Sequence, residues 1–159
     1  MSKPDNVLER VLQNYGDLLF DLCESVLWSP SGAQIAFQTI LKELKKSHPS
    51  NRYTQYERAW VLKIACERLR KLSRKFARRL SPAEQIMLDS SVAVTSRLKH
   101  FDSYFHRLGT DDQILLLLRD KYGLTYLEIS AALGLPEGTL KTRRQQALRT
   151  LEEWLWDRE

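Results

Sequence analysis

The segment Leu124–Leu151, LTYLEISAALGLPEGTLKTRRQQALRTL, constrains the fold of this chain more than any other. It predicts two short helices joined by a tight turn. Gly134 lies where the chain must turn, because a positive φ costs glycine little, and Pro136 fits the start of a new helix. Glu137 and Arg149 carry the charges that suit the two ends of the second helix dipole. We therefore expect a helix-turn-helix, which docks its second helix into a DNA groove.

The first of these helices carries a short apolar pattern, which we expect to supply its packing contacts. Its members are Leu127, Ile129, Ala132 and Leu133.

The second helix divides into an apolar side and a polar side when it is projected at 100° per residue. The apolar side holds Leu140, Ala147, Leu148 and Leu151. Amide side chains can pair with base edges, and flanking cations neutralise phosphates. A merely solvated polar face is the alternative interpretation. The residues that we expect to contact DNA are Thr139, Lys141, Thr142, Arg143, Gln145, Gln146 and Arg149.

The positive charge of the chain is concentrated in its middle. The formal net charge is +5, yet the segment Lys63–Leu80 alone holds eight basic residues and one acidic residue. Its apolar residues recur at helical spacing and would fix one cationic face outward. Such a strip binds phosphates or serves solubility, and we favour phosphate binding. The residues expected to do so are Arg68, Arg70, Lys71, Arg74 and Lys75.

Other features of the sequence argue against an enzyme and against a membrane protein. The N-terminus lacks the apolar segment of a secretion signal, and no apolar run approaches membrane-spanning length, so we expect a cytoplasmic protein. Cys23 and Cys66 are isolated within apolar helical patterns, which indicates buried free thiols. His48, His100 and His106 have no companions at ligand spacing and are interpreted as ordinary surface or satisfied histidines. We expect no metal, no cofactor and no catalytic activity.

The remaining sequence is helical in pattern and shows no strand alternation. Apolar residues from Val7 to Leu22 predict a first helix that ends near the turn at 29–32. A second helix should carry Ile35, Phe37, Ile40, Leu41 and Leu44, and a third should begin around Gln55. Residues 81–84 and 110–113 match the spacing of a capping box.

We therefore predict an all-α chain of two small helical domains joined by a linker. The N-terminal domain spans residues 1–78, the linker and a new helix start span 79–95, and the helix-turn-helix domain spans 96–159.

With these segments in order, the chain resembles bacterial sigma factors of the extracytoplasmic-function group, with a divergent N-terminal domain. The resemblance covers almost the full length. It is most specific in GLTYLEISAALGLPEGTLKTR at 123–143, and WVLKIACERLRK at 60–71 is similar to the helix that opens the downstream promoter element. The resemblance implies a dissociable subunit that binds core RNA polymerase, recognises promoter DNA and starts transcription, with an anti-sigma factor as a further partner.

The sequence departs from the group in the second helix. Acidic residues that grip the polymerase are usual there, and this chain carries Gln34, Phe37 and Gln38, which become the expected polymerase-binding residues. Arg144 stands where an apolar residue is usual. Tyr53, Tyr56 and Trp60 are candidates for stacking on unstacked bases, although core packing is favoured for Trp60.

Two interpretations follow. The chain is a working, divergent sigma factor, or it is a sigma-like regulator that binds an anti-sigma factor or another partner without programming polymerase. A generic helix-turn-helix repressor would leave the N-terminal similarity unexplained.

Overall fold

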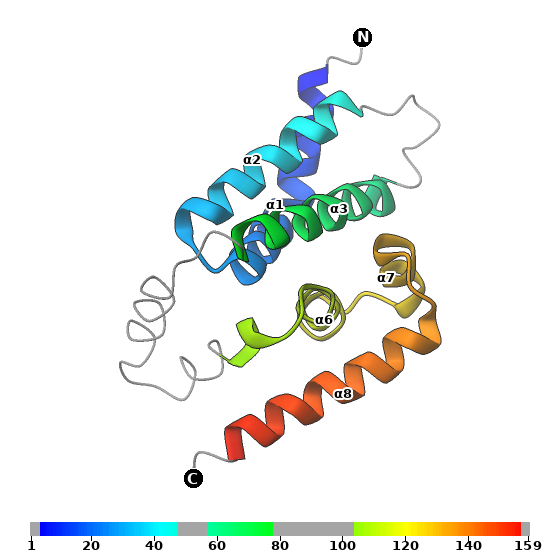
Figure 1. The fold of residues 1–159 in the computed structure, drawn as a ribbon. Coiled ribbons are helices and arrows are strands. Elements are labelled where there is room, and N and C mark those ends of the chain that lie inside the picture. The colour runs from blue at the N-terminus through cyan, green and yellow to red at the C-terminus, as the bar shows by residue number, and fades with distance from the viewer. Residues whose placement is uncertain (1–3, 48–56, 78–103, 157–159) are drawn as a thin grey trace.

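The fold is helical throughout the part of the chain that the computed structural model describes, residues 4–47, 57–77 and 104–156. The elements are α1 (Pro4–Leu27), α2 (Pro30–Lys46), α3 (Glu57–Ala77), α6 (Thr110–Leu116), η2 (Leu117–Lys121), α7 (Tyr126–Leu133) and α8 (Glu137–Trp156). Within these ranges, α1, α2 and α3 make the N-terminal half, and α6, η2, α7 and α8, preceded by a helical segment at 104–107, make the C-terminal half (Figure 1). The predicted all-α fold is confirmed for these ranges. The predicted linker at 79–95 and the capping box at 81–84 lie outside them.

The turn between α1 and α2 is tight and locally determined. Trp28 adopts a positive φ of 44°, which reverses the chain after α1. The Ser29 hydroxyl then caps α2 by accepting a hydrogen bond from the Gly32 amide at 3.2 Å, and Pro30 fills the first helical position. Pro is tolerated there because its missing N–H would have no partner within the helix. The helix therefore begins where the sequence predicted a turn.

The helix-turn-helix forms from α7 and α8. Thr125 caps α7 in a full capping box with Glu128, a motif that the sequence analysis missed. Gly134 ends α7 in the left-handed conformation at φ 70°, as predicted. The Leu140 amide donates to the Pro136 carbonyl at 3.0 Å, so α8 starts directly after the proline. The predicted turn chemistry at 134–136 is confirmed.

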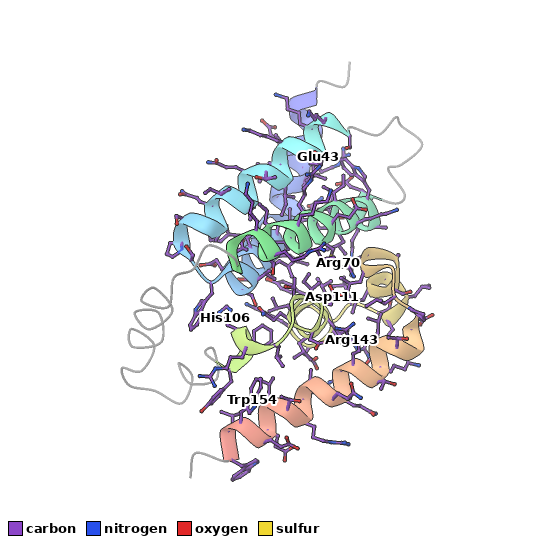
Figure 2. The ribbon with its side chains drawn as sticks, viewed as in Figure 1. Glu43, Arg70, His106, Asp111, Arg143 and Trp154 are labelled. Carbon is purple, nitrogen blue, oxygen red and sulfur yellow. The ribbon has the colours of Figure 1, made fainter. Side chains whose placement is uncertain are left out.

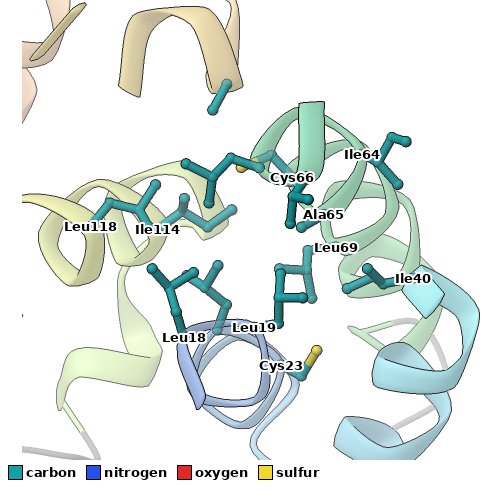
Figure 3. Packing of buried hydrophobic residues seen from close by; sticks show 14 of the residues in the cluster. Leu18, Leu19, Cys23, Ile40, Ile64, Ala65, Cys66, Leu69, Ile114 and Leu118 are labelled. Carbon is teal, nitrogen blue, oxygen red and sulfur yellow. The ribbon is translucent and has the colours of Figure 1, made fainter. Parts of the chain in front are cut away.

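One apolar core runs through both halves of the molecule. Ile114 and Leu118 of the C-terminal half are fully buried and point toward α1 and α3 (Figure 3). They belong to the same buried cluster as Leu19 of α1 and Leu69 of α3. Figure 1 shows α6 between the N-terminal helices on one side and α8 on the other. The C-terminal half is thus docked on the N-terminal half, which the division into two domains did not predict.

Several predicted packing residues are exposed in the structure, Leu12 of α1 among them at 38%. Leu127 is 68% exposed, because α7 buries Ile129, Ala132 and Leu133 and turns Leu127 outward. Ile35 is 48% exposed on the side of α2 away from the core, and Leu148 is 39% exposed on α8. Helical periodicity placed these residues at the edge of an apolar stripe. The part of each helix that is buried is narrower than this stripe, so the edge residues remain exposed.

The capping box expected at 110–113 is also wrong. Gly109 occupies the cap position of α6 without a side-chain hydrogen bond. The Thr110 hydroxyl lies 2.6 Å from the Ser73 hydroxyl of α3, and Gln113 is buried. The Gln113 amide donates to the Leu108 carbonyl at 2.8 Å. Both side chains serve contacts between segments rather than the start of α6.

We predict that Ile114→Ala lowers the free energy of unfolding by about 2 to 5 kcal/mol, because it removes a fully buried side chain and leaves a cavity in the shared core. Urea unfolding followed by circular dichroism measures this change. Ile35→Ala, on the exposed side of α2, is the control and should stay within about 0.5 kcal/mol of the parent. Equal stability of the two variants would show that the shared core does not form.

Candidate nucleic-acid interface

The outward face of α8 is polar and open to solvent. Thr139, Lys141, Thr142, Gln145, Gln146 and Arg149 are exposed, and Arg143 is half-buried. The opposite face holds Leu140, Ala147 and Leu151, each at most 3% exposed. Apart from Leu148, the predicted division of α8 into two sides is confirmed.

Arg143 is held in a groove on this face by a residue that the sequence analysis did not consider. Its Nε donates to Asp112 Oδ1 of α6 at 2.9 Å. Thr139, Thr142 and Gln146 line the same groove. Figure 2 labels Arg143 on α8, on the side that faces α6. Asp112 therefore fixes the guanidinium beside three side chains predicted to contact DNA. The only sequence signal for Asp112 was its place in the first turn of α6.

Arg144 explains one departure from the family pattern. It stands where an apolar residue is usual, and in this structure it pairs with Asp120 of η2, with Nε donating to Oδ2 at 3.0 Å. This hydrogen bond raises the pKa of Arg144. Arg144 thus fastens α8 to η2 through Asp120.

The side chain of Lys141 on α8 lies beside the aromatic ring of Tyr126, the first residue of α7. Its Nζ is 5.6 Å from the ring centroid, and the Arg119 guanidinium is 4.5 Å from the same centroid. Arg119 also donates to the Leu124 carbonyl at 2.9 Å. Two cations over one aromatic ring make this corner positive, which suits an anionic backbone.

The cationic strip of α3 is only partly free. Lys71, Arg74 and Lys75 are exposed. Arg68 is paired with Glu43 of α2 at 2.9 Å. Arg70 points instead toward the C-terminal half (Figure 2). Phosphate contact by these five residues remains a prediction, and two of them already have anionic partners within the chain.

Arg70 makes three hydrogen bonds to the C-terminal half. Its Nε and Nη2 donate to the two carboxylate oxygens of Asp111 at 2.7 and 3.1 Å, and Nη2 donates to the Leu133 carbonyl at 2.7 Å. Bidentate pairs of this kind are the stronger charge-assisted hydrogen bonds. The hydrogen bond that Arg70 donates to Asp111 raises the pKa of Arg70. The strip residue at the centre of α3 is therefore engaged between α6 and the end of α7.

The predicted polymerase-binding residues lie together on α2. Gln34 and Gln38 are exposed, and Phe37 is half-buried against the core. Phe37 packs edge-to-face with Phe20 of α1 at 5.5 Å between ring centroids, and Phe20 is 37% exposed. An aromatic pair at the surface of α1 and α2 thus stands beside the two neutral glutamines. Phe20 was not recognised in the sequence.

Of the aromatic candidates for base stacking, Trp60 is half-buried and packs against the core, as favoured. Tyr53 and Tyr56 lie outside the described residues.

The cysteines are buried free thiols, as predicted. Burial raises the pKa of both Cys23 and Cys66 to about 12. No group of side chains suited to a metal ion occurs among the described residues. Nor does any helix in the described ranges have the length and apolar character to cross a membrane.

His106 differs from the ordinary histidine that the sequence suggested. Its ring stacks on Trp28 with centroids 4.1 Å apart, at the junction of α1 with the C-terminal half. Its Nδ1 is buried and has no hydrogen-bond partner. Burial lowers the pKa of His106 to about 4, against a smaller opposing effect of a backbone hydrogen bond with Ser25. The neutral ring therefore belongs to the docked arrangement.

Comparison with known proteins identifies the C-terminal half. The sequence pattern of the family described as Sigma-70, region 4 matches residues 101–151. Residues 101–151 are therefore similar to a sigma-70 region 4 domain. The structure of CnrH in complex with the cytosolic domain of CnrY has the same fold, with a TM-score of 0.66 and 17% sequence identity over 96% of this chain and 89% of that chain. No curated protein sequence matches the chain. The predicted resemblance to sigma factors is confirmed, and the region 4 domain contains α6, η2, α7 and most of α8.

We predict that acid loosens the packing of the region 4 domain on α1 through His106. Its pKa is about 4 in the folded chain and 6.5 in an exposed ring, so the stability that the neutral ring contributes is present above pH 6.5 and is lost as the pH falls toward 4. At pH 5 the loss should be about 1 to 2 kcal/mol.

Urea unfolding at pH 7 and pH 5 tests this expectation. His106→Gln keeps a donor for the Ser25 carbonyl and should show a smaller fall in stability between the two pH values. An identical fall in parent and variant would assign the acid sensitivity to other groups.

Proposed function

We propose that this chain is a working sigma factor, a dissociable subunit that brings core RNA polymerase to promoters and does no chemistry of its own. The observation that carries the proposal is a match to sigma-70 region 4 whose helix α8 presents a largely polar and cationic face to solvent. The N-terminal half supports it with a second cationic helix, α3. A protein of this kind acts in the cytoplasm, where its polymerase and its promoters are.

In this proposal α8 binds duplex DNA of the upstream promoter element. Gln145 and Gln146 are free to pair with base edges, and Lys141 and Arg149 stand beside them for phosphates. Asp112 keeps Arg143 in its groove, so this arginine meets DNA in one orientation. The exposed cations of α3, Lys71, Arg74 and Lys75, would bind the backbone of the downstream element.

A second function is favoured by the surface of α2. Its exposed glutamines carry no charge where acidic residues usually meet the polymerase, and the structural neighbour CnrH was solved with the cytosolic domain of CnrY. A sigma-like regulator that binds an anti-sigma factor and does not program polymerase would fit these two facts. Transcription from genomic DNA with core polymerase and purified chain separates the two, because only a working sigma factor yields specific transcripts.

We predict that substitutions on α8 separate base reading from phosphate binding. Gln146→Ala should cost about 1 to 3 kcal/mol on a preferred sequence and relax specificity at one base pair. Lys141→Ala should weaken all sequences alike and reduce the salt slope by about one. Binding is measured by fluorescence anisotropy on a duplex selected in vitro, at several salt concentrations. Unchanged affinity in both variants would mean that α8 presents only a solvated face.

A further prediction concerns α2 and core polymerase. The double variant Gln34→Asp with Gln38→Glu should bind polymerase more tightly at low salt, since each new near-surface pair is worth up to about 1 kcal/mol. Phe37→Ala should weaken binding by removing apolar contact area, and Thr39→Ala, elsewhere on the helix, is the control. Surface plasmon resonance on immobilised core polymerase gives the affinities. Failure of the parent and the acidic variant to bind would leave the sigma-like regulator as the remaining function.

A further inference from the structure

The two halves of the chain are fastened by charged pairs as well as by the shared core. Among the residues that the structure describes, three ion pairs cross from the N-terminal helices to the C-terminal half, at 2.9, 2.7 and 2.7 Å. They join Arg58 to Glu128, Arg70 to Asp111, and Lys121 to Asp21. The Tyr122 hydroxyl also donates to Asp21. The docked arrangement is therefore specified by polar geometry in addition to apolar burial.

The pair at Arg70 uses a group that lies in the cationic strip of α3. Three hydrogen bonds from Nε and Nη2 go to Asp111 and to the Leu133 carbonyl. A phosphate would have to displace a bidentate carboxylate and a helix-end carbonyl together. While the halves are docked, Arg70 is unavailable to nucleic acid.

The face of α8 is open in the same docked form. Lys141, Thr142, Gln145 and Gln146 are all exposed, and α8 lies on the side of α6 that faces away from the N-terminal helices (Figure 1). Its apolar side is covered by α6 and α7 within the region 4 domain. Binding of α8 to a duplex therefore needs no separation of the halves.

We propose that the free chain is half-masked: α8 binds duplex DNA while the halves are docked, and α3 presents Arg70 to nucleic acid, beside the exposed Lys71, Arg74 and Lys75, only after the Arg70–Asp111 clamp opens. The proposal rests on the proposed function for the role of α8. It makes engagement of the two promoter elements sequential, with the upstream duplex first. Asp111 acts through Arg70 and is not itself a contact to nucleic acid.

The clamp is a suitable control point because it is partly exposed. The side chains of Arg70 and Asp111 are 29% and 24% accessible, so solvent weakens the pair. Its loss should change the ratio of open to docked chain by several-fold, up to about tenfold, while the apolar core between the halves resists full separation. A modest shift of this size can be produced by binding energy from DNA or polymerase.

The first test measures the distance between the halves in the full chain. Spin labels are attached to cysteines introduced at Gln13 of α1 and Glu153 of α8, both exposed, and the native cysteines are buried and protected from labelling. Pulsed electron resonance should give one narrow distance in the parent. Asp111→Asn should add a longer-distance population, and Glu43→Gln, which breaks the Arg68 pair within the N-terminal half, should not.

The charge swap Arg70→Asp with Asp111→Arg should restore the single distance, because it remakes the pair with opposite polarity. A broad distribution in the parent, or no change with Asp111→Asn, would overturn the clamp.

The second test measures binding of two DNA probes by the parent and by two variants. One is a duplex selected in vitro by the parent chain, and the other is a single-stranded oligothymidine of 20 nucleotides. Asp111→Asn should bind the oligothymidine several-fold more tightly than the parent and bind the duplex equally well. Glu9→Gln, at an exposed position of α1, removes the same charge without releasing a cation of the strip and is the control for general electrostatics.

Each remaining outcome has a definite meaning. Equal gains on both probes, equal gains in both variants, or no oligothymidine binding by any variant would overturn half-masking. If no duplex can be selected with the parent chain, the proposed role of α8 is refuted. The distance measurement then still tests whether the Arg70–Asp111 clamp holds the halves together.

Discussion

The burial of Ile114 and Leu118 between α1 and α3 is the contact on which the rest of this structure depends. Both side chains are fully buried in a core that the N-terminal helices could not complete alone. Their burial fixes α6 and η2; α8 then packs on α6 and α7, and α7 packs on α3. The position of α8 therefore follows from apolar packing at a distance from its outward face. The turn at Gly134 and the capping box at Thr125 only set how α7 and α8 meet.

The charges of the chain act in two ways within this arrangement. The net charge of +5 favours nucleic acid, yet several arginines are used inside the protein. Arg144 fastens α8 to η2, Arg143 is oriented by Asp112, and Arg70 joins α3 to the region 4 domain. The cations left exposed are mostly lysines and the outer arginines of α3 and α8. Charge counting alone overstates how much of the cationic strip is free.

The sequence predicted the helices, the turn at 134–136 and the outward face of α8, because these depend on local periodicity and on glycine and proline. It did not predict the docking of the halves, because the pairing of Arg70 with Asp111 joins residues that are 41 positions apart. The contacts of Asp112 with Arg143 and of Trp28 with His106 were not predicted for the same reason, since each joins residues that are far apart in the sequence. Leu127 was misplaced because the width of a buried stripe depends on neighbours that periodicity does not contain. The sequence thus predicted site residues that share one helix, and it did not predict pairs of residues that come together from different helices.

The central claim is that the free chain is a single docked body with α8 facing outward. Small-angle X-ray scattering of the purified chain tests it most directly. A compact chain of this length has a radius of gyration of about 15 Å, and the docked structure predicts a value within a few ångströms of that figure. Two separated domains would give a distinctly larger radius with a distance distribution of two maxima, and that result would contradict the account.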